Sequence, residues 1–527
     1  MPALPKSINV LRATWQTARM ARRLRRLSTG VPAQAETLTR LLEKIAATTY
    51  GGDLGISADM NYAQFRARVP VRDHDQLEPY LRRIKRGEPN VLWPGHCEGH
   101  TQTSGTTGPP KWLPVTPALR AHFDQAGHDA LLHYTARAGQ TRILLGRRLF
   151  LAPALDYAPI VPPELSGRPP PEGTLHPFRV EAGWGTKENP EAEDPSVEAC
   201  NGIKVTRALA ERVLRQDITL VGGLPNWLLN FAETVRDCAG VENLPFDTLR
   251  DVWPNLECVV HHGIPIGPFH DELRRLAGPA VAFHEVYFAA EAFIAVQDAH
   301  AGSGLRLLAE SEVFFEFLPL SDYNENLPLS LGAKALSLQE VRVEEDYVLL
   351  LTTPAGLCRY VLGDIVRFVS LEPPRLLYVG RTKLRLGVFD ENVIERDLTD
   401  ALVAVCQQHN WTITNFHVAP LFNNTLTGGL RGRHEWWVEL RPGTAETPTG
   451  PILATHLDGE LQARNATYAE KRRTTLEAPV VRLVMPGFFA HWMERQGKSG
   501  GHQKMPRCRN DRVIADEFSA VACFNAD

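Results

Sequence analysis

The chain has 527 residues, which is too many for one compact core, so we expect two or more domains. Hydrophobic residues make up 43% and charged residues 22% of the sequence, as in an ordinary soluble globular protein. The formal net charge of -4 gives no reason to expect nucleic acid as the main partner. No apolar run reaches the roughly 18 residues that span a bilayer. These features predict a cytoplasmic protein with no nucleic-acid and no membrane partner, and they leave the oligomeric state open.

The N-terminal segment is rich in arginine and has no acidic residue before Glu36. Its arginines are Arg12, Arg19, Arg22, Arg23, Arg25 and Arg26. This composition is typical of a mitochondrial transit peptide, but it also suits a surface helix. We favour the helix, with these apolar side chains facing the core: Leu11, Trp15, Met20, Leu24 and Leu27.

Helical spacing and short apolar runs alternate along the first 380 residues. Helices are expected over 5–50, 74–86, 206–216 and 225–238. Strands are expected at 218–221, 258–260, 280–283, 286–296, 305–318, 347–353 and 375–379. Polar, glycine-bearing or proline-rich composition indicates a loop at 101–116 and an irregular insertion at 153–200. The alternation predicts an α/β fold, a large N-terminal domain in which helices flank β-sheets.

The pattern changes near residues 380–395, where short glycine-bearing links follow a strand. After this point we expect a helix over 395–408, strands near 412–419 and 434–440, and a helix over 456–473. The sequence therefore predicts a large domain of residues 1–385 and a smaller α+β domain of residues 386–527.

Residues 103–111 read Thr-Ser-Gly-Thr-Thr-Gly-Pro-Pro-Lys and combine hydroxyls, two glycines and a lysine. Glycine lets backbone N–H groups approach a polyphosphate closely, while hydroxyls and a lysine add donors and positive charge. The order is not that of the GxxxxGK[ST] loop, because Trp492 stands where the one Gly-Lys-Ser of the chain would need glycine. It is not the GxSxG elbow of a serine hydrolase either. The segment predicts a phosphate-binding loop.

In order and spacing, this segment resembles the phosphate-gripping signature of adenylate-forming enzymes, the superfamily of acyl-CoA synthetases and firefly luciferase. Within that superfamily, the chain resembles the acyl-acid amido synthetases of the auxin-responsive Gretchen Hagen family, as a bacterial-type member. The likeness runs over nearly the whole chain. It includes Tyr80 to Glu88, Phe314 to Pro319, Leu351 to Leu357, Arg359-Tyr360, Gly363-Asp364, Asp458, Leu461, Asn465, Tyr468, Arg472 and Lys504 to Cys508.

The resemblance implies a ligase that uses ATP and Mg. Such an enzyme adenylates a small-molecule carboxylic acid, releases pyrophosphate, and passes the acyl group to an amine, that of an amino acid. The smaller domain would rotate between the two half-reactions. Lys111 would offset charge on the departing pyrophosphate, and Lys504 would reach the reacting oxygen during adenylation. The resemblance assigns nucleotide contacts in the loop to Thr103, Ser104, Gly105, Thr106 and Thr107.

Two further motifs complete the implied nucleotide site. In the first, Tyr287 would stack on adenine and Glu291 would help to hold Mg. The family usually has two serines between them, and this chain has Ala289 and Ala290. In the second motif, Asp364 would bind the ribose hydroxyls.

The second motif also departs from the family pattern, because Val361 stands where the family has an arginine. The departure removes one positive charge near the nucleotide. Arg359 or Arg381 would supply that charge instead.

Two other functions stay open on the sequence: a ligase that transfers the acyl group to a thiol such as CoA, and an inactive nucleotide-binding regulatory protein. The stretch from His96 to His100 lacks further ligands and favours no metal site. His261-His262 is expected near a strand end, where it would touch substrate. Eight scattered cysteines without zinc or redox spacing predict reduced thiols.

Overall fold

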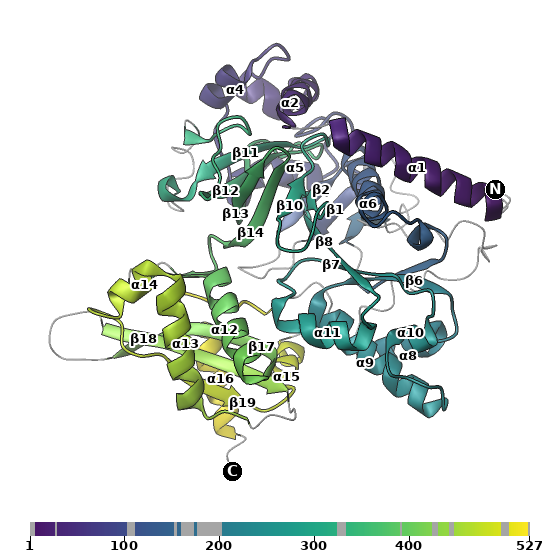
Figure 1. Ribbon diagram of the computed structural model, residues 1–527. Helices are drawn as coiled ribbons and strands as arrows, with labels where there is room; N and C mark the ends of the chain where they lie inside the picture. Colours follow the sequence, from purple (N-terminus) through teal and green to yellow (C-terminus); the bar gives the residue numbers. More distant parts are fainter. Residues whose placement is uncertain are drawn as a thin grey trace. The chain divides into compact units, whose positions relative to one another are not determined.

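The computed structural model describes residues 6–26, 29–102, 111–151, 155–159, 173–175, 203–323, 332, 334–389, 391, 393–423, 431–441, 447–496 and 505–524. These residues form two compact units (Figure 1). The first unit holds the described residues up to 102, then 111–263 and 277–378; the second holds 264–276 and the described residues from Val379 onward. The predicted division after residue 385 stays a prediction. No described helix is both long and apolar enough to cross a membrane.

Helices open the first unit, as predicted. They are α1 (Lys6–Arg26), α2 (Val31–Ile45), α3 (Thr49–Leu54), α4 (Tyr62–Arg68), α5 (His74–Lys85) and α6 (Pro117–Ala138). Capping boxes start α4 and α5, in which Asn61 and Asp73 accept the backbone N–H three residues on. Later helices of the first unit are α8 (Ile203–Val213), α9 (Pro225–Val241) and α10 (Leu249–Val252). Helix α11 (His270–Ala277) belongs to the second unit except for its last residue.

A ten-stranded mixed sheet forms the centre of the first unit, among the residues that the structure describes. Its strand order is β11-β12-β13-β14-β10-β9-β8-β7-β6-β3. The bounds are β3 (Arg147–Phe150), β6 (Ile218–Gly223), β7 (Cys258–His261), β8 (Ala282–Ala289), β9 (Ala292–Val296), β10 (Leu305–Leu307), β11 (Phe314–Pro319), β12 (Asp346–Thr352), β13 (Tyr360–Leu371) and β14 (Pro374–Arg381). Strands β3, β6, β7 and β8 pair in parallel, whereas β8 and β9 pair antiparallel. Strand β8 is therefore the point at which the sheet changes from parallel to antiparallel.

A smaller antiparallel sheet has the order β2-β1-β4-β5. Its strands are β1 (Gly99–Gln102), β2 (Trp112–Val115), β4 (Leu155–Pro159) and β5 (Gly173–Leu175). Residues 103–110 join β1 to β2 and lie outside the described part of the chain. The segment that was predicted to bind phosphate thus connects two paired strands.

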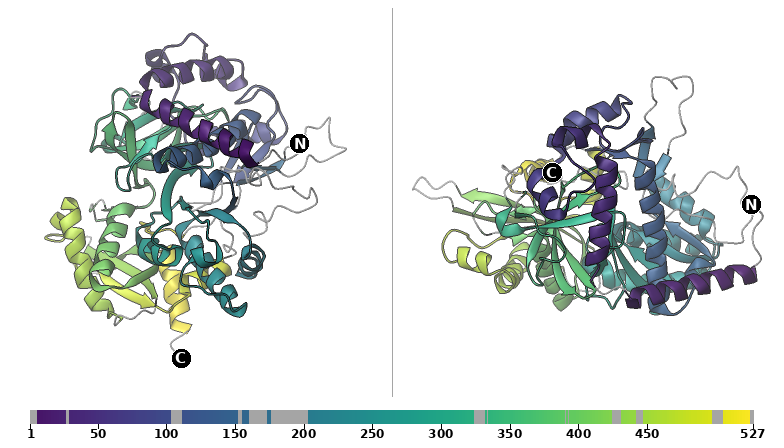
Figure 2. Two further views of the ribbon diagram at one scale, coloured as in Figure 1. Left: turned by 45° about the vertical axis from the view of Figure 1, so that its right-hand side comes forward. Right: turned by 90° about the horizontal axis from the view of Figure 1, so that it is seen from above.

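The second unit is built on a three-stranded sheet, drawn in green to yellow in Figures 1 and 2. Its central strand, β18, pairs antiparallel with β17 and parallel with β19. The elements are β15 (Arg385–Leu386), β16 (Val393–Ile394), α12 (Glu395–His409), β17 (Thr412–Asn423), β18 (Arg431–Arg441), α13 (Gly450–Arg464), α14 (Ala466–Lys471), β19 (Val480–Val484), α15 (Phe488–Arg495) and α16 (Val513–Phe524). The predicted helix over 456–473 is broken at Asn465, whose side chain caps α14 by accepting from the Tyr468 N–H.

The α/β class is confirmed, but several local predictions are wrong. The strand expected over 305–318 is two strands, β10 and β11. The strand expected over 286–296 is a hairpin that turns at Ala290 and Glu291. The strand β13 was not expected at all. On α1, Leu11 and Trp15 do not face the core, because they are 70% and 59% exposed. Met20 is buried as predicted and Leu24 is half-buried, and the helix also buries Asn9 and Ala13. Leu27 lies outside the described residues.

Candidate active site

Lys111 lies directly before β2 and directly after the undescribed segment, and it is half-buried. The base of this hairpin is fixed by the pairing of Gln102 with Trp112. The Trp112 ring stacks on His100 with ring centroids 3.3 Å apart, and the Lys85 ammonium lies 3.1 Å from the Trp112 centroid. Burial, together with the charge of Lys85, lowers the pKa of His100 to about 4, so His100 stacks as a neutral ring at physiological pH. The hairpin residues next to Lys111 are therefore held in place by packing.

The predicted contacts of five loop residues and of one lysine fall outside the described residues. These are Thr103, Ser104, Gly105, Thr106, Thr107 and Lys504. Their roles stay predictions. Lys111, Tyr287, Glu291, Asp364 and Arg381 are described.

Tyr287 and Glu291 belong to the β8–β9 hairpin. Tyr287 pairs with Ala295, and the register shifts between Tyr287 and the next residue, so the strand is irregular at this point. Ala290 and Glu291 form the two-residue turn, and Glu291 is buried although it is charged. Turns usually lie on the surface, so a buried carboxylate at a tight turn is unusual. Carboxylate oxygens are ligands that Mg prefers, which fits the role predicted for Glu291.

Asp364 lies on an irregular stretch of β13. Strand β12 pairs Val348 with Ile365 and Leu350 with Val361, so β13 has two more residues than β12 between the same two pairs. Gly363 has a φ of 84°, a conformation that glycine adopts without strain. Such irregularities redirect a side chain away from the ordinary alternation of a strand. Here the redirected side chain is the buried carboxylate of Asp364.

The structure brings Tyr287 and Asp364 together. The Tyr287 hydroxyl donates a hydrogen bond of 2.6 Å to Asp364 Oδ2, and both side chains are buried. Tyr378 of β14 packs edge-on against Tyr287 with ring centroids 5.7 Å apart. Strands β8 and β13 are separated in the sheet by β9, β10 and β14, so this part of the sheet must curve for the bond to form. An aromatic ring and a carboxylate from two separate motifs thus form one site.

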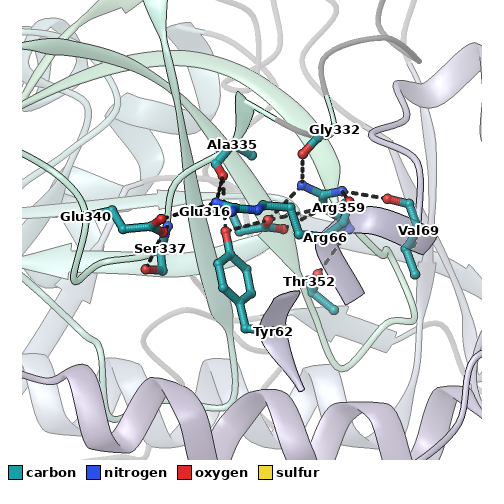
Figure 3. A network of polar contacts seen from close by, with 10 residues as sticks. All are labelled: Tyr62, Arg66, Val69, Glu316, Gly332, Ala335, Ser337, Glu340, Thr352 and Arg359. Atoms are coloured by element: carbon teal, nitrogen blue, oxygen red, sulfur yellow. Dashed lines mark hydrogen bonds and ion pairs between the residues drawn. The ribbon is translucent and has the colours of Figure 1, made fainter. Parts of the chain in front are cut away.

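Arg359 does not supply the charge that Val361 lacks. Its guanidinium is fully buried and is bound to Glu316 of β11 and to three backbone oxygens (Figure 3). The Nε atom donates to Glu316 Oε2 at 2.9 Å, and the second terminal nitrogen donates to Glu316 Oε1 at 2.9 Å. The remaining bonds go to the carbonyl oxygens of Arg66, Val69 and Gly332, at 3.0, 2.6 and 2.7 Å. Since these bonds use all five N–H donors of the side chain, none remains for a nucleotide.

Burial in an apolar cluster explains why residue 361 is a valine and not an arginine. It is buried in a cluster with Val71, Leu318, Val348 and Leu350. An arginine at this position would have to leave the cluster or be buried in it without a counter-charge. Arg381 ends β14 and belongs to the second compact unit. Its contribution to the nucleotide site stays a prediction.

The pair of Arg359 with Glu316 was not recognised from the sequence. Its one signal was a single charged residue inside the apolar run Phe314-Phe315-Glu316-Phe317-Leu318. Tyr62 adds to the network by donating to Glu316 Oε1 at 3.1 Å (Figure 3). The network ties α4, β11 and the start of β13 together.

The remaining candidate histidines divide into two groups. His261 ends β7, where it pairs with Glu285 of β8, and the His262 ring lies 4.5 Å from the Phe288 ring, centroid to centroid. Both histidines are therefore near the carboxyl end of a parallel strand and close to the motif that contains Tyr287. His96 interacts with the Gly87 carbonyl oxygen at 3.1 Å. Among the described residues, no group of three or more His, Cys, Asp and Glu side chains is arranged to hold a metal ion.

Comparisons with known proteins show the family to which the chain belongs. Models of the GH3 family N-terminal, central and C-terminal domains match residues 24–147, 306–381 and 396–513, more than half of the chain in total. A probable indole-3-acetic acid-amido synthetase of Oryza sativa subsp. japonica is 25% identical over 90% of each chain. An indole-3-acetic acid-amido synthetase of Arabidopsis thaliana, GH3.17, is 22% identical over 92% of each chain.

Solved structures share the fold. An acyl acid amido synthetase in complex with 2,4-DB superposes with a TM-score of 0.72 at 16% identity, covering 99% of this chain and 97% of that chain. A 2-hydroxyisobutyryl-CoA ligase in the postadenylation state gives a TM-score of 0.54 at 14% identity, over 97% and 91% of the two chains. The large first domain and the smaller second domain match these amido synthetase structures. The resemblance stated from the sequence is thereby confirmed, and the chain belongs to the GH3 family.

Proposed function

We propose that this chain is an ATP-dependent acyl-acid amido synthetase, a ligase that adenylates a carboxylic acid and transfers the acyl group to the amine of an amino acid. The observation that carries the proposal is the bond between Tyr287 and Asp364 on irregular stretches of two strands, next to the buried Glu291. A site for a nucleoside triphosphate needs an aromatic ring that stacks on the base, an acceptor for the ribose hydroxyls and a ligand for the cation on the phosphates. The names of the relatives, which are amido synthetases, support the same reaction.

Each of these side chains has a proposed role toward ATP. The Tyr287 ring stacks on adenine, and its hydroxyl orients the carboxylate that accepts the ribose hydroxyls. Asp364 is buried, so its bond from Tyr287 holds it in one direction before ATP arrives. Lys111 and the residues 103–107 face the phosphates, and Arg381 adds positive charge. Under this proposal residues 1–385 bind ATP and the acid, and residues 386–527 carry Lys504.

The residues present fit a magnesium ion. Mg is usually bound by one or two carboxylates together with substrate phosphates, rather than by a full cage of protein ligands. The buried Glu291 offers one hard oxygen ligand, and no larger cluster occurs among the described residues. When bound there, the ion would neutralise charge on the phosphates.

The proposed chemistry has two steps. A carboxylate oxygen of the acid attacks the α-phosphorus of ATP, the bond to the β-phosphate breaks, and pyrophosphate leaves. The amine nitrogen then attacks the acyl carbon, the bond to AMP breaks, and the amine loses a proton. Lys111 stabilises the charge that develops as pyrophosphate departs. Since the reaction consumes ATP and an amino acid, we place the enzyme in the cytoplasm.

A pyrophosphate-release screen over carboxylic acids crossed with amino acids tests the proposal. Mass spectrometry of the products should show an amide. Transfer to CoA and to no amino acid would instead indicate a thiol ligase. No pyrophosphate with any acid in the presence of ATP and Mg would indicate an inactive nucleotide-binding protein.

Two substitutions test the site itself. Lys111→Ala and Glu291→Ala should each lower the rate of adenylation by at least about a hundredfold, because the first removes a positive charge beside the phosphates and the second removes the proposed ligand of the magnesium ion. Circular dichroism should show an unchanged fold. Lys44→Ala on α2 and Glu211→Ala on α8 are matched controls at exposed positions and should keep the full rate. Full rates in Lys111→Ala and Glu291→Ala would place the site elsewhere.

A further inference from the structure

Helix α1 carries seven basic residues and no acidic residue over Lys6–Arg26. It lies along the outside of the first unit beside α6, as both views in Figure 2 show. Basic helices with large apolar side chains on the same surface are a recognised form of membrane-surface anchor. The two faces of α1 must therefore be considered separately.

The inner face of α1 packs on α6. Ala13 and Met20 are buried there. The Thr17 hydroxyl donates to the Thr135 hydroxyl oxygen at 2.9 Å, and Arg23 forms an ion pair of 3.0 Å with Asp129. These contacts fix the rotation of the helix about its axis and so determine which side chains point outward.

The outer face of α1 is defined here by six residues: Ile8, Leu11, Trp15, Arg19, Arg22 and Arg25. The first three follow the three- and four-residue spacing of one helical face. Ile8 is 46% exposed, and Leu11 and Trp15 are more exposed still. The three arginines are exposed as well, on the C-terminal half of the helix. The Arg19 guanidinium lies 5.4 Å from the Trp15 ring centroid.

We propose that the outer face of α1 docks this protein on an anionic lipid surface. This departs from the prediction of no membrane partner, which considered only runs long enough to span a bilayer. The apolar side chains enter the boundary between headgroups and acyl chains, where tryptophan is favoured, and the arginines pair with lipid phosphates. Charge complementarity selects this occupant over a second copy of the chain, because two such faces carry the same sign of charge. Three large exposed apolar side chains select lipid over nucleic acid, whose backbone offers them no apolar partner.

Flotation of the full-length protein with vesicles tests the proposal. The protein should float with vesicles that contain phosphatidylglycerol and stay in solution with vesicles of phosphatidylcholine alone. High salt should weaken the binding, since the arginines act partly through screened charge. The double variant Leu11→Glu with Trp15→Glu should bind at least about tenfold more weakly, because it removes apolar contact and adds negative charge.

Val241→Glu is the matched control, because Val241 is also 70% exposed but lies at the end of α9. It should bind vesicles as the wild type does, and both variants should keep the wild-type rate of pyrophosphate release. The proposal is overturned if the wild type floats with neither vesicle, or if the double variant floats equally well. It is also overturned if the wild type dimerises through this face, or binds duplex DNA, without binding vesicles.

Discussion

Tyr287 has two proposed functions: its ring stacks on adenine, and its hydroxyl orients Asp364. A substitution at this residue can separate the two. Tyr287→Phe keeps the ring and removes the donor. We expect the KM for ATP to rise about tenfold with a smaller change in kcat, because a hydrogen bond to a charged group contributes about 1.5–3 kcal/mol. Steady-state pyrophosphate release measures both constants.

Tyr347→Phe provides the comparison for that prediction. The Tyr347 hydroxyl also donates to a carboxylate, that of Glu345 at 2.8 Å, but it has no proposed contact with ATP. Its KM for ATP should stay at the wild-type value. Equal KM values in wild type and Tyr287→Phe would contradict the orienting role of the hydroxyl.

The buried pair of Arg359 and Glu316 makes a second prediction at the scale of single residues. Arg359→Met leaves a carboxylate buried without its counter-charge, and breaking such a pair typically costs about 3–5 kcal/mol. Urea unfolding should show this loss. The exposed pair of Arg207 and Glu211 is the contrast, and Arg207→Met should change stability by less than about 0.5 kcal/mol. A similar small change in Arg359→Met would show that water relieves the buried carboxylate.

Asp298 links elements of the central sheet and makes their stability depend on pH. Burial raises the pKa of Asp298, but hydrogen bonds and charge from Arg375 of β14 and Arg306 of β10 outweigh it, so the pKa is lowered. A carboxyl group whose pKa is lower in the folded chain than in the unfolded chain stabilises the fold at pH values above the unfolded pKa of about 4. This stabilisation is lost as the pH falls below that value and through the lower pKa of the folded chain. Asp298→Asn should unfold more easily than wild type at neutral pH and lose less stability on acidification. Urea unfolding at several pH values measures both slopes, and parallel slopes would contradict the linkage.

The turn before Arg359 depends on a single glycine. Gly356 has a φ of 80°, and a Cβ atom placed on it would lie 2.1 Å from the Leu92 carbonyl oxygen. Gly356→Ala should therefore destabilise the first unit by well over about 1 kcal/mol. Gly240→Ala in α9 meets nothing within 4 Å and should be neutral or slightly stabilising. Thermal unfolding of the two variants gives the comparison, and equal midpoints would mean that the turn rearranges.

Element boundaries show where the sequence was informative and where it was not. Helix α5 was predicted within a residue or two, because Asp73 caps it and Gly87 follows its end. The turn at Ala290 and Glu291 was missed because neither residue is a typical turn former and neither has a positive φ. The orientation of α1 was missed because apolar side chains occur on both of its faces, so spacing alone does not say which face is buried.

For the whole molecule, the cysteines provide a probe of unfolding. The six whose side chains the structure describes are free thiols, five of them buried and Cys97 half-buried. Burial raises the pKa of Cys97, Cys358 and Cys406 to about 12 in each case. In a background with Cys200→Ser and Cys523→Ser, native thiols should react with a disulfide reagent at least about a hundredfold more slowly than in urea. Fast reaction of the native protein would show that a core opens easily.

The candidate site was predictable to the extent that short motifs carry it. Tyr287, Glu291 and Asp364 were each proposed from their motifs, but the contact between Tyr287 and Asp364, which are 77 residues apart in sequence, depends on the curvature of the sheet. Arg359 was misjudged for the same reason. Its partners on β11 and near α4 are 43 and about 290 residues away in sequence, so no local pattern reveals that its donors are already used.

The kind of partner that Arg359 has also affects how the sequence can vary. Three of its bonds end on backbone oxygens, at Arg66, Val69 and Gly332, and a backbone oxygen is present whatever the side chain. Among the described residues, Glu316 is the one whose side chain accepts hydrogen bonds from the guanidinium. Among related sequences, positions 316 and 359 should therefore covary or stay fixed together, whereas the hydrogen bond to Val69 places no such constraint on position 69. Position 332 should stay small, because a Cβ atom on Gly332 would lie 3.1 Å from Arg359 Nη1.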